Sequence, residues 1–229
     1  MHRVARFKDR TDAGCLLAQA LAVYRDKNPV VLALPRGGVP VAAEVAKALN
    51  APLDLVLVRK IGAPMQPELA IGAVVDGADP IVVRNAEIIS ATGTTPIEFD
   101  KICVREAAEI ERRHRAYLGN RPPVPLQGAT AIVVDDGIAT GATMMAALRA
   151  IRRRQPAKLV LAVPTAAPES LGSLRREADA TVCLTAPDYF GSVGAFYEDF
   201  RQISDEEVIA TMAKQPVPGS SLAPSARPS

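Results

Sequence analysis

Short apolar runs alternate along this chain with segments of helical periodicity, and this alternation constrains the fold more than any other feature. A short apolar run bounded by turn residues is typical of a strand buried on both faces of a sheet. Helical patterns separate most of the runs, and such βαβ units imply a parallel sheet with right-handed crossovers. The sequence therefore predicts an α/β fold, doubly wound, with a mostly parallel sheet. The predicted strands are 30–34, 53–58, 130–135, 158–163 and 180–184.

The segment between the second and third runs breaks this alternation. Residues 59–72 contain two prolines, two glycines and little periodicity, which predicts a flexible loop. Residues 73–83 surround an Asp-Gly pair and predict a hairpin attached to that loop. Apolar residues then recur at steps of four and three over 96–118, which predicts one long helix with an apolar stripe. This helix could also supply a face for a homodimer.

The composition indicates one globular domain rather than a membrane or nucleic-acid-binding protein. With 229 residues and 48% hydrophobic residues, we expect one domain over 1–213, followed by a Pro- and Ser-rich disordered tail over 214–229. A net charge of +2 is too small for a dedicated nucleic-acid binder. The three cysteines form no metal-binding pattern, and no apolar run approaches the roughly 20 residues of a membrane span. These features predict a cytoplasmic protein.

The stretch IVVDDGIATGATM (132–144) combines an apolar run, two adjacent acids and a loop with almost no side-chain bulk. In open parallel sheets, ligands bind beyond the carboxyl ends of the strands. A loop of small residues that opens a helix suits a phosphate, because unpaired N–H groups and the positive end of the helix dipole face it. Asp135 and Asp136 suit vicinal hydroxyls or a hydrated Mg²⁺. A nucleotide P-loop is excluded, because Ala142 stands where that motif requires lysine.

This stretch resembles the signature of the type I phosphoribosyltransferases, which bind phosphoribosyl pyrophosphate. The resemblance implies that Asp135 and Asp136 bind the ribose hydroxyls. It also implies that the loop that follows them binds the 5-phosphate. The loop residues are Ala139, Thr140, Gly141, Ala142 and Thr143.

Two further motifs occur in the order that this family predicts. LPRGGVP (34–40) matches a loop that contacts pyrophosphate, often through a non-proline cis peptide, and its candidates are Arg36, Gly37 and Gly38. VRKIGAP then opens the flexible loop, where Arg59 and Lys60 are the catalytic candidates for contact with pyrophosphate. Over about 3–213 the chain is similar to a bacterial group of phosphoribosyltransferase-domain proteins without an assigned acceptor.

The resemblance implies Mg²⁺-dependent transfer of a phosphoribosyl group to a nitrogenous acceptor, a base or an amine, with release of pyrophosphate. Mg²⁺ would lie near Asp135 and Asp136, directly or through ribose or water. A small C-terminal hood over about 185–213 would close over the acceptor, with Tyr189 and Phe190 as stacking candidates. Phe196 and Phe200 fit a small aromatic core as well as they fit such a surface.

The residue before the Thr-Gly of the phosphate loop is Ala139, where members specific for 6-oxopurines carry an acid. This difference argues against hypoxanthine or guanine as the acceptor, and nothing in the chain selects adenine. Two other functions remain open from the sequence. One is a non-catalytic module that binds phosphoribosyl pyrophosphate or nucleotides and regulates another process, and the other is a sugar-phosphate hydrolase that uses the same site. Retention of both the acid pair and the basic loop favours catalysis.

Overall fold

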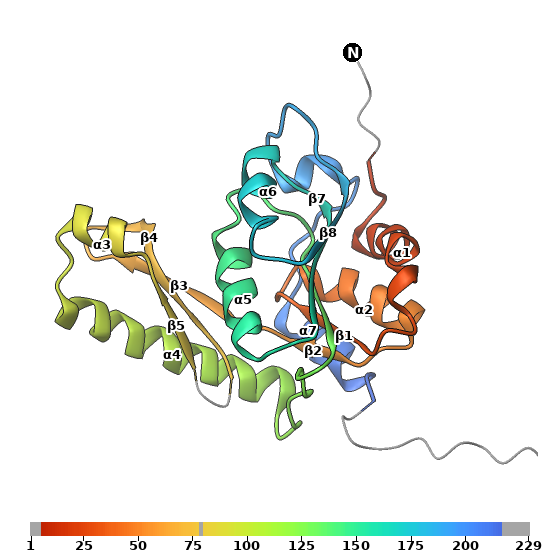
Figure 1. The fold of residues 1–229 in the computed structure, drawn as a ribbon, viewed down its shortest axis with the longest axis horizontal. Helices are drawn as coiled ribbons and strands as arrows, with labels where there is room; N and C mark the ends of the chain where they lie inside the picture. Colours follow the sequence, from red (N-terminus) through yellow and green to blue (C-terminus); the bar gives the residue numbers. More distant parts are fainter. Residues whose placement is uncertain (1–5, 78–79, 217–229) are drawn as a thin grey trace, which may run out of the picture.

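A five-stranded parallel sheet forms the centre of the molecule (Figure 1). The structure, a computed structural model, describes residues 6–77 and 80–216. The strand order is β2-β1-β6-β7-β8, which confirms the predicted α/β class. β2 lies beside β1 on one side of the sheet, and β7 and β8 follow β6 on the other side. The direction in which successive strands are added therefore reverses between β1 and β6. The strands are β1 (Pro29–Ala33), β2 (Leu53–Leu55), β6 (Thr130–Val134), β7 (Lys158–Thr165) and β8 (Ala180–Thr185).

Helices cover both faces of this sheet, as the doubly wound prediction requires. One face carries α1 (Arg10–Ala20) and α2 (Gly38–Leu49), and the other carries α5 (Ala142–Arg153) and α6 (Pro168–Leu174), as Figure 1 shows. A 3₁₀ turn at Ala22–Tyr24 follows α1.

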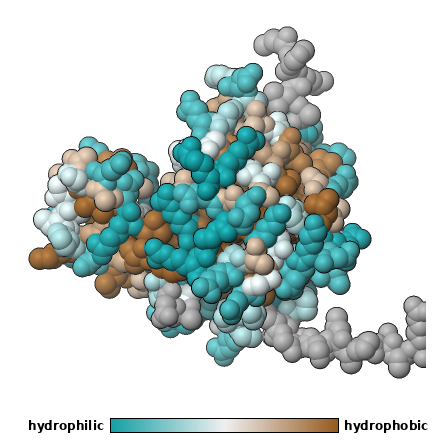
Figure 2. Space-filling view, in the orientation of Figure 1, coloured by the Kyte–Doolittle hydropathy of each residue, from teal (hydrophilic) through white to brown (hydrophobic). Residues whose placement is uncertain are grey.

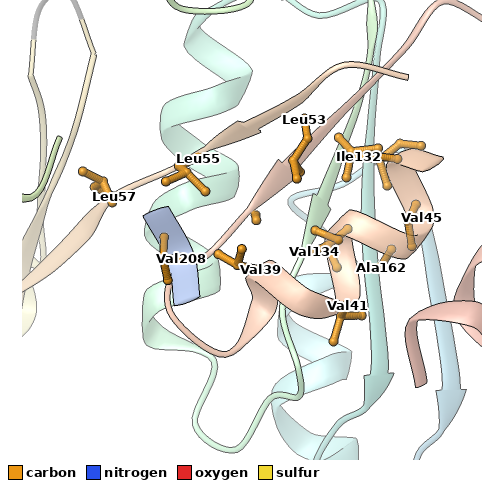
Figure 3. Close-up of a cluster of buried hydrophobic side chains, with 14 of the residues drawn as sticks. Val39, Val41, Val45, Leu53, Leu55, Leu57, Ile132, Val134, Ala162 and Val208 are labelled. Atoms are coloured by element: carbon orange, nitrogen blue, oxygen red, sulfur yellow. The ribbon is translucent and has the colours of Figure 1, made fainter. Parts of the chain in front are cut away.

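Alternate strand residues face the two layers of helices, because successive side chains of a strand point to opposite faces. Val31 of β1 packs in the cluster that includes α2, while Val30 and Leu32 pack in the cluster that includes α5. Figure 3 shows the first cluster, in which side chains of α2, β2, β6 and the C-terminal helix α7 (Asp205–Ala213) meet. Burial of each large aliphatic side chain contributes about 1.5–3 kcal/mol, so both layers anchor the sheet.

A second, antiparallel sheet projects from the core together with the long helix (Figures 1 and 2). It consists of β3 (Val58–Ala63), β4 (Gln66–Val75) and β5 (Ile81–Arg84), and we call residues 58–84 the flap. The prediction of a loop over 59–72 was wrong, since β3 and most of β4 occupy it, whereas the hairpin predicted at 73–83 is confirmed. Register shifts between Ile61 and Ala63 interrupt the alternation of side chains, so the sequence shows no period of two there.

The base of the flap is held by a buried carboxyl group. Asp76 donates its backbone N–H to the Leu57 carbonyl at 2.9 Å, and its Oδ1 accepts the Leu57 N–H at 2.9 Å. The Arg154 guanidinium at the end of α5 donates to the Asp76 carbonyl. Asp76 is buried, and this burial raises its pKa to about 7. The flap is thereby joined to the core by polar contacts that are shielded from water.

The long helix α4 (Pro96–Leu118) confirms the prediction for 96–118. Thr95 and Glu98 form a capping box at its start, and Pro96 occupies the first turn, where a missing N–H costs nothing. Buried residues of the predicted stripe, such as Phe99 and Ile110, belong to the hydrophobic cluster that also includes side chains of the flap and α2. A short helix that the sequence analysis did not predict, α3 (Ala86–Thr92), connects the flap to α4.

The last described segment returns to the core through a 3₁₀ turn at Val193–Phe196 and α7. Phe7 pairs with Tyr197 and donates its N–H to the Phe196 carbonyl at 2.8 Å, so the beginning of the chain joins this segment. Most of the predicted tail, residues 217–229, lies outside the described residues. Among the described residues, no helix is both long and apolar enough to span a bilayer.

Candidate functional site

Asp135 and Asp136 lie at the carboxyl end of β6, at the point where the strand order reverses. This is the position at which ligands bind in doubly wound sheets. The loop that follows β1 meets them there. A Cβ placed on Gly37 would lie 2.6 Å from Asp136 Cγ, and one placed on Gly38 would lie 2.9 Å from Asp135 Cα. Only glycine allows this approach, so the structure brings the two predicted motifs into contact.

The loop after β1 contains a cis peptide bond between Pro35 and Arg36, and the second residue of that bond is not proline. The Arg36 guanidinium lies 3.5 Å from the Asp205 carboxylate at the start of α7. It also lines a cavity of about 360 Å³ together with Gly37 and Asp136. The predicted pyrophosphate loop therefore borders an open volume beside the acid pair.

The two acids are partly buried and contact each other. Asp135 Oδ1 accepts the backbone N–H of Asp136 at 2.8 Å. Burial raises the pKa of Asp135 well above its usual range, and the neighbouring Asp136 carboxylate raises it further. Burial also raises the pKa of Asp136, but a guanidinium that donates to its carboxylate opposes this rise.

That guanidinium belongs to Arg10, the first residue of α1, which the sequence analysis did not single out. Arg10 Nε donates to Asp136 Oδ2 at 2.7 Å, and the side chains of Arg10 and Asp136 are only 9% and 13% exposed. The Tyr197 hydroxyl donates to the backbone carbonyl of Asp136 at 2.5 Å. No local pattern in the sequence relates these residues, because Arg10 and Tyr197 are 126 and 61 positions from Asp136.

The predicted phosphate loop leads from the acid pair into α5. Gly141 adopts a left-handed φ of 76°, which favours glycine, and is the N-cap of the helix. Ser170 of α6 donates to the Ala139 carbonyl at 2.5 Å and so tethers the loop. Thr140 to Thr143 line a cavity of about 460 Å³ between α5, α6 and the flap. Figure 2 shows hydrophobic surface where the flap meets the core.

Lys60 and Arg59 are neighbours on β3 but have different partners. Lys60 lines the cavity beside the phosphate loop, and its ammonium donates to the Glu68 carboxylate at 3.1 Å. Arg59 instead donates to Glu106 of α4 at 2.8–2.9 Å. Glu106 is buried and also accepts hydrogen bonds from Arg105. The structure thus places Lys60 near the phosphate loop but holds Arg59 against α4.

A second cavity lies between the flap and α4. Its volume is about 660 Å³, and Lys60, Arg59 and Thr143 all contribute to its wall. The two candidate basic residues and the end of the phosphate loop therefore share one continuous region at the base of the flap.

The aromatic residues near the C-terminus divide into a packed group and one exposed ring. Phe196 and Tyr197 are buried, and Phe190 stacks on Phe196 with ring centroids 5.1 Å apart. Phe200 is partly buried and lies under the Arg10 guanidinium at 4.0 Å. Tyr189 is 89% exposed. The small aromatic core considered for Phe196 and Phe200 is present, while an acceptor-binding role for Tyr189 and Phe190 stays a prediction.

The sequence model of the phosphoribosyl transferase domain matches residues 10–201, which include the acid pair and both loops. The chain belongs to the phosphoribosyl transferase domain family. The parallel-sheet fold and the signature at residues 132–144 therefore both agree with the family match.

Individual members of the family are similar over most of this chain. Two Mycobacterium tuberculosis proteins, provisionally named phosphoribosyl transferases in strains CDC 1551 and H37Rv, are each 47% identical to it over 204 residues. These alignments cover 89% of this chain and 46% of each relative, so the chain spans about half the length of the curated relatives it matches. The crystal structure of TT1426 from Thermus thermophilus is 42% identical, with a TM-score of 0.81 over 92% of this chain and 99% of that one.

Proposed function

We propose that this phosphoribosyl transferase domain transfers the phosphoribosyl group of phosphoribosyl pyrophosphate to a nitrogenous acceptor, with Mg²⁺ and with release of pyrophosphate. The observation that carries the proposal is the contact of the acid pair with the Arg36–Gly38 loop at the carboxyl ends of β6 and β1. The same strand end leads into a phosphate loop that caps α5. Sites for ribose, pyrophosphate and a 5-phosphate would thus adjoin one another.

Each part of the substrate has a matching chemical environment. The 5-phosphate would accept hydrogen bonds from the N–H groups at the start of α5 and from the hydroxyls of Thr140 and Thr143. The ribose hydroxyls would donate to Asp135 and Asp136. Pyrophosphate would lie against the loop after β1, within reach of Arg36. These contacts orient the ribose so that its C1 atom faces the acceptor.

The reaction needs no nucleophile from the protein. The acceptor nitrogen attacks C1 as the bond to pyrophosphate breaks, and positive charge develops on the ribose ring. The protein then contributes by holding the reactants in line and by stabilising the charge that leaves with pyrophosphate. Arg36 and Lys60, which line the cavities beside the acid pair and the phosphate loop, would be the cations for the second task. The flap, which carries Lys60, would exclude water from the site.

The donor set fits Mg²⁺ that arrives with its substrate. Among the described residues, no cluster of three or more His, Cys, Asp or Glu side chains could hold a metal. Mg²⁺ typically binds one or two carboxylates and completes its shell with substrate phosphates and water. Asp135 and Asp136 would supply that carboxylate contact directly or through ribose and water. Mg²⁺ bound there would neutralise charge on the leaving pyrophosphate.

The proposal is tested by following pyrophosphate release from phosphoribosyl pyrophosphate with Mg²⁺ and a panel of bases and amines. An Asp135→Asn/Asp136→Asn variant should reduce release by at least about a hundredfold, since removal of one electrostatic contact can already cost that much. Release without any acceptor would identify a hydrolase, and tight binding without release would identify a regulatory module. Absence of both binding and release would overturn the phosphoribosyl assignment for this chain.

A further inference from the structure

We propose that Arg10 is a positioning residue for the acid pair: it fixes the Asp136 carboxylate at the ribose site and links it to the aromatic segment 190–203. This inference rests on the proposed function, because it assigns Arg10 a task in recognition of the ribose hydroxyls. The family match and the proposed mechanism assign no role to Arg10.

Arg10 is bound on three sides. Its Nε donates to Asp136 Oδ2 at 2.7 Å, and its Nη1 donates to the Arg201 carbonyl at 2.8 Å. The guanidinium lies over the Phe200 ring at 4.0 Å. The side chain is only 9% exposed, so water contributes little to its solvation. A planar group with several donors and a stackable face is needed for all three contacts, which favours arginine over lysine.

The aromatic segment 190–203 also contacts the backbone of Asp136. The Tyr197 hydroxyl donates to the Asp136 carbonyl at 2.5 Å, while Arg10 connects the Asp136 side chain to Arg201 and Phe200. Side chain and backbone are thus fixed together. A shift of the aromatic segment would change the direction in which the Asp136 carboxylate points.

The ion pair leaves a defined set of acceptor atoms for the ligand. Asp136 Oδ2 accepts from Arg10, and Asp135 Oδ1 accepts the Asp136 N–H. Within residues 6–77 and 80–216, neither Asp136 Oδ1 nor Asp135 Oδ2 accepts a hydrogen bond from a backbone N–H or a basic side chain, and the two carboxyl groups also interact with each other. The oxygens that Arg10 and the Asp136 N–H do not occupy are the ones that would accept from vicinal hydroxyls. Loss of Arg10 would leave the Asp136 carboxylate free to rotate, so its oxygens would no longer have one fixed orientation toward the ribose.

The test compares the affinities of ribose 5-phosphate and 2-deoxyribose 5-phosphate, measured by isothermal titration calorimetry. Both probes use the phosphate loop, but only the first offers vicinal hydroxyls. We expect the wild-type chain to prefer ribose 5-phosphate by about tenfold, the effect of one hydrogen bond to a charged group. Arg10→Gln should reduce this preference to less than about threefold while affinity for the deoxy probe stays nearly unchanged. Arg10→Lys should fall between the two.

Two control variants separate positioning from general damage. Arg25 is exposed and its guanidinium donates to the Ala48 carbonyl, away from the acid pair, so Arg25→Gln should keep the wild-type preference. In an Asp136→Asn background, Arg10→Gln should change the preference no further. If Arg10→Gln does not fold, the positioning role is tested with Arg10→Lys and Phe200→Leu by the same ratio of affinities for ribose 5-phosphate and 2-deoxyribose 5-phosphate.

The outcomes separate the two proposals. A wild-type chain that binds neither sugar phosphate, or binds both equally, contradicts the proposed function. A wild-type preference that survives in Arg10→Gln, or an equal loss of affinity for both probes in every Arg10 variant, overturns the positioning role alone.

Discussion

Substitution of Gly37 by alanine tests whether the loop after β1 lies directly against the acid pair. The new Cβ would lie 2.6 Å from Asp136 Cγ and nearer still to Oδ2. Carbon atoms ordinarily meet at about 3.5–4.0 Å, so one partner must move by roughly 1 Å. The loop has little freedom to retreat, because Gly38 already lies against the backbone of β6. The displacement should therefore fall on the Asp136 carboxylate and break its hydrogen bond with Arg10.

The expected loss follows from two effects. Overpacking of a close contact typically costs about 1–3 kcal/mol of unfolding free energy, and a lost hydrogen bond between charged groups costs about 1.5–3 kcal/mol. We expect a combined loss of about 2–5 kcal/mol for Gly37→Ala, since part of each cost can relax. For a chain of this size, that loss corresponds to a fall in melting temperature of roughly 5–15 °C. Thermal and urea denaturation followed by circular dichroism would measure it.

Two matched variants show whether the loss has this origin. A Cβ added to Gly172 in α6 would meet no atom within 4 Å, so Gly172→Ala should be neutral or slightly stabilising. Asp136→Ala removes the atoms with which the new methyl group collides, so Gly37→Ala should cost less than about 1 kcal/mol in that background. A Gly37→Ala protein with the wild-type melting temperature, or with an equal loss in both backgrounds, would refute the reasoning.

Three further predictions concern the flap and the core. Because burial raises the pKa of Asp76 to about 7, above its value in the unfolded chain, its contribution to stability is present at low pH and is lost as the pH rises from about 4 to 7. Asp76→Asn should therefore gain about 2–3 kcal/mol relative to wild type between pH 5 and pH 8 in urea titrations, and a constant difference would contradict the assignment. Arg59→Met removes a partner of the buried Glu106 carboxylate and should speed hydrogen exchange in β3 and β4 at least tenfold. Lys60→Met breaks only an exposed ion pair with Glu68, so it should change the exchange rate less than about threefold. Thr165→Val should raise the melting temperature by a few degrees, because the buried Thr165 Oγ1 has no hydrogen-bond partner within the described part of the chain; a lower melting temperature would show that the hydroxyl is satisfied.

The central sheet could be predicted from the sequence because its signal is local. Each buried strand is a short apolar run, and the turn residues that bound it are adjacent in the chain. Residues 59–72 of the flap lacked this signal. Register shifts near Gly62 interrupt the alternation of side chains, and Pro64 and Pro67 are typical of loops. Pairing between β3 and β4 depends on backbone hydrogen bonds, which leave little trace in the pattern of side chains.

The acid pair and the two glycine-containing loops could be predicted because each is one contiguous motif. Glu106 and Tyr197 could not, since they act through partners 47 and 61 positions away. The ion pair of Glu106 with Arg59 also changes how the predicted role of Arg59 is interpreted. The basic side chain of Arg59 was predicted to contact pyrophosphate. In the structure it is paired with the buried carboxylate of Glu106 in α4, and no local spacing in the sequence reveals this pair.

Two adjacent acids at the end of a buried strand pose an electrostatic problem that local sequence cannot solve. Burial penalises both carboxylates, and their proximity adds repulsion. Arg10 supplies a compensating positive charge from the start of α1 and opposes the rise in the pKa of Asp136. In the proposed function, this charge would help Asp136 to accept hydrogen bonds from neutral ribose hydroxyls. A buried acid pair of this kind therefore implies a cation elsewhere in the chain, and only the three-dimensional arrangement shows which residue provides it.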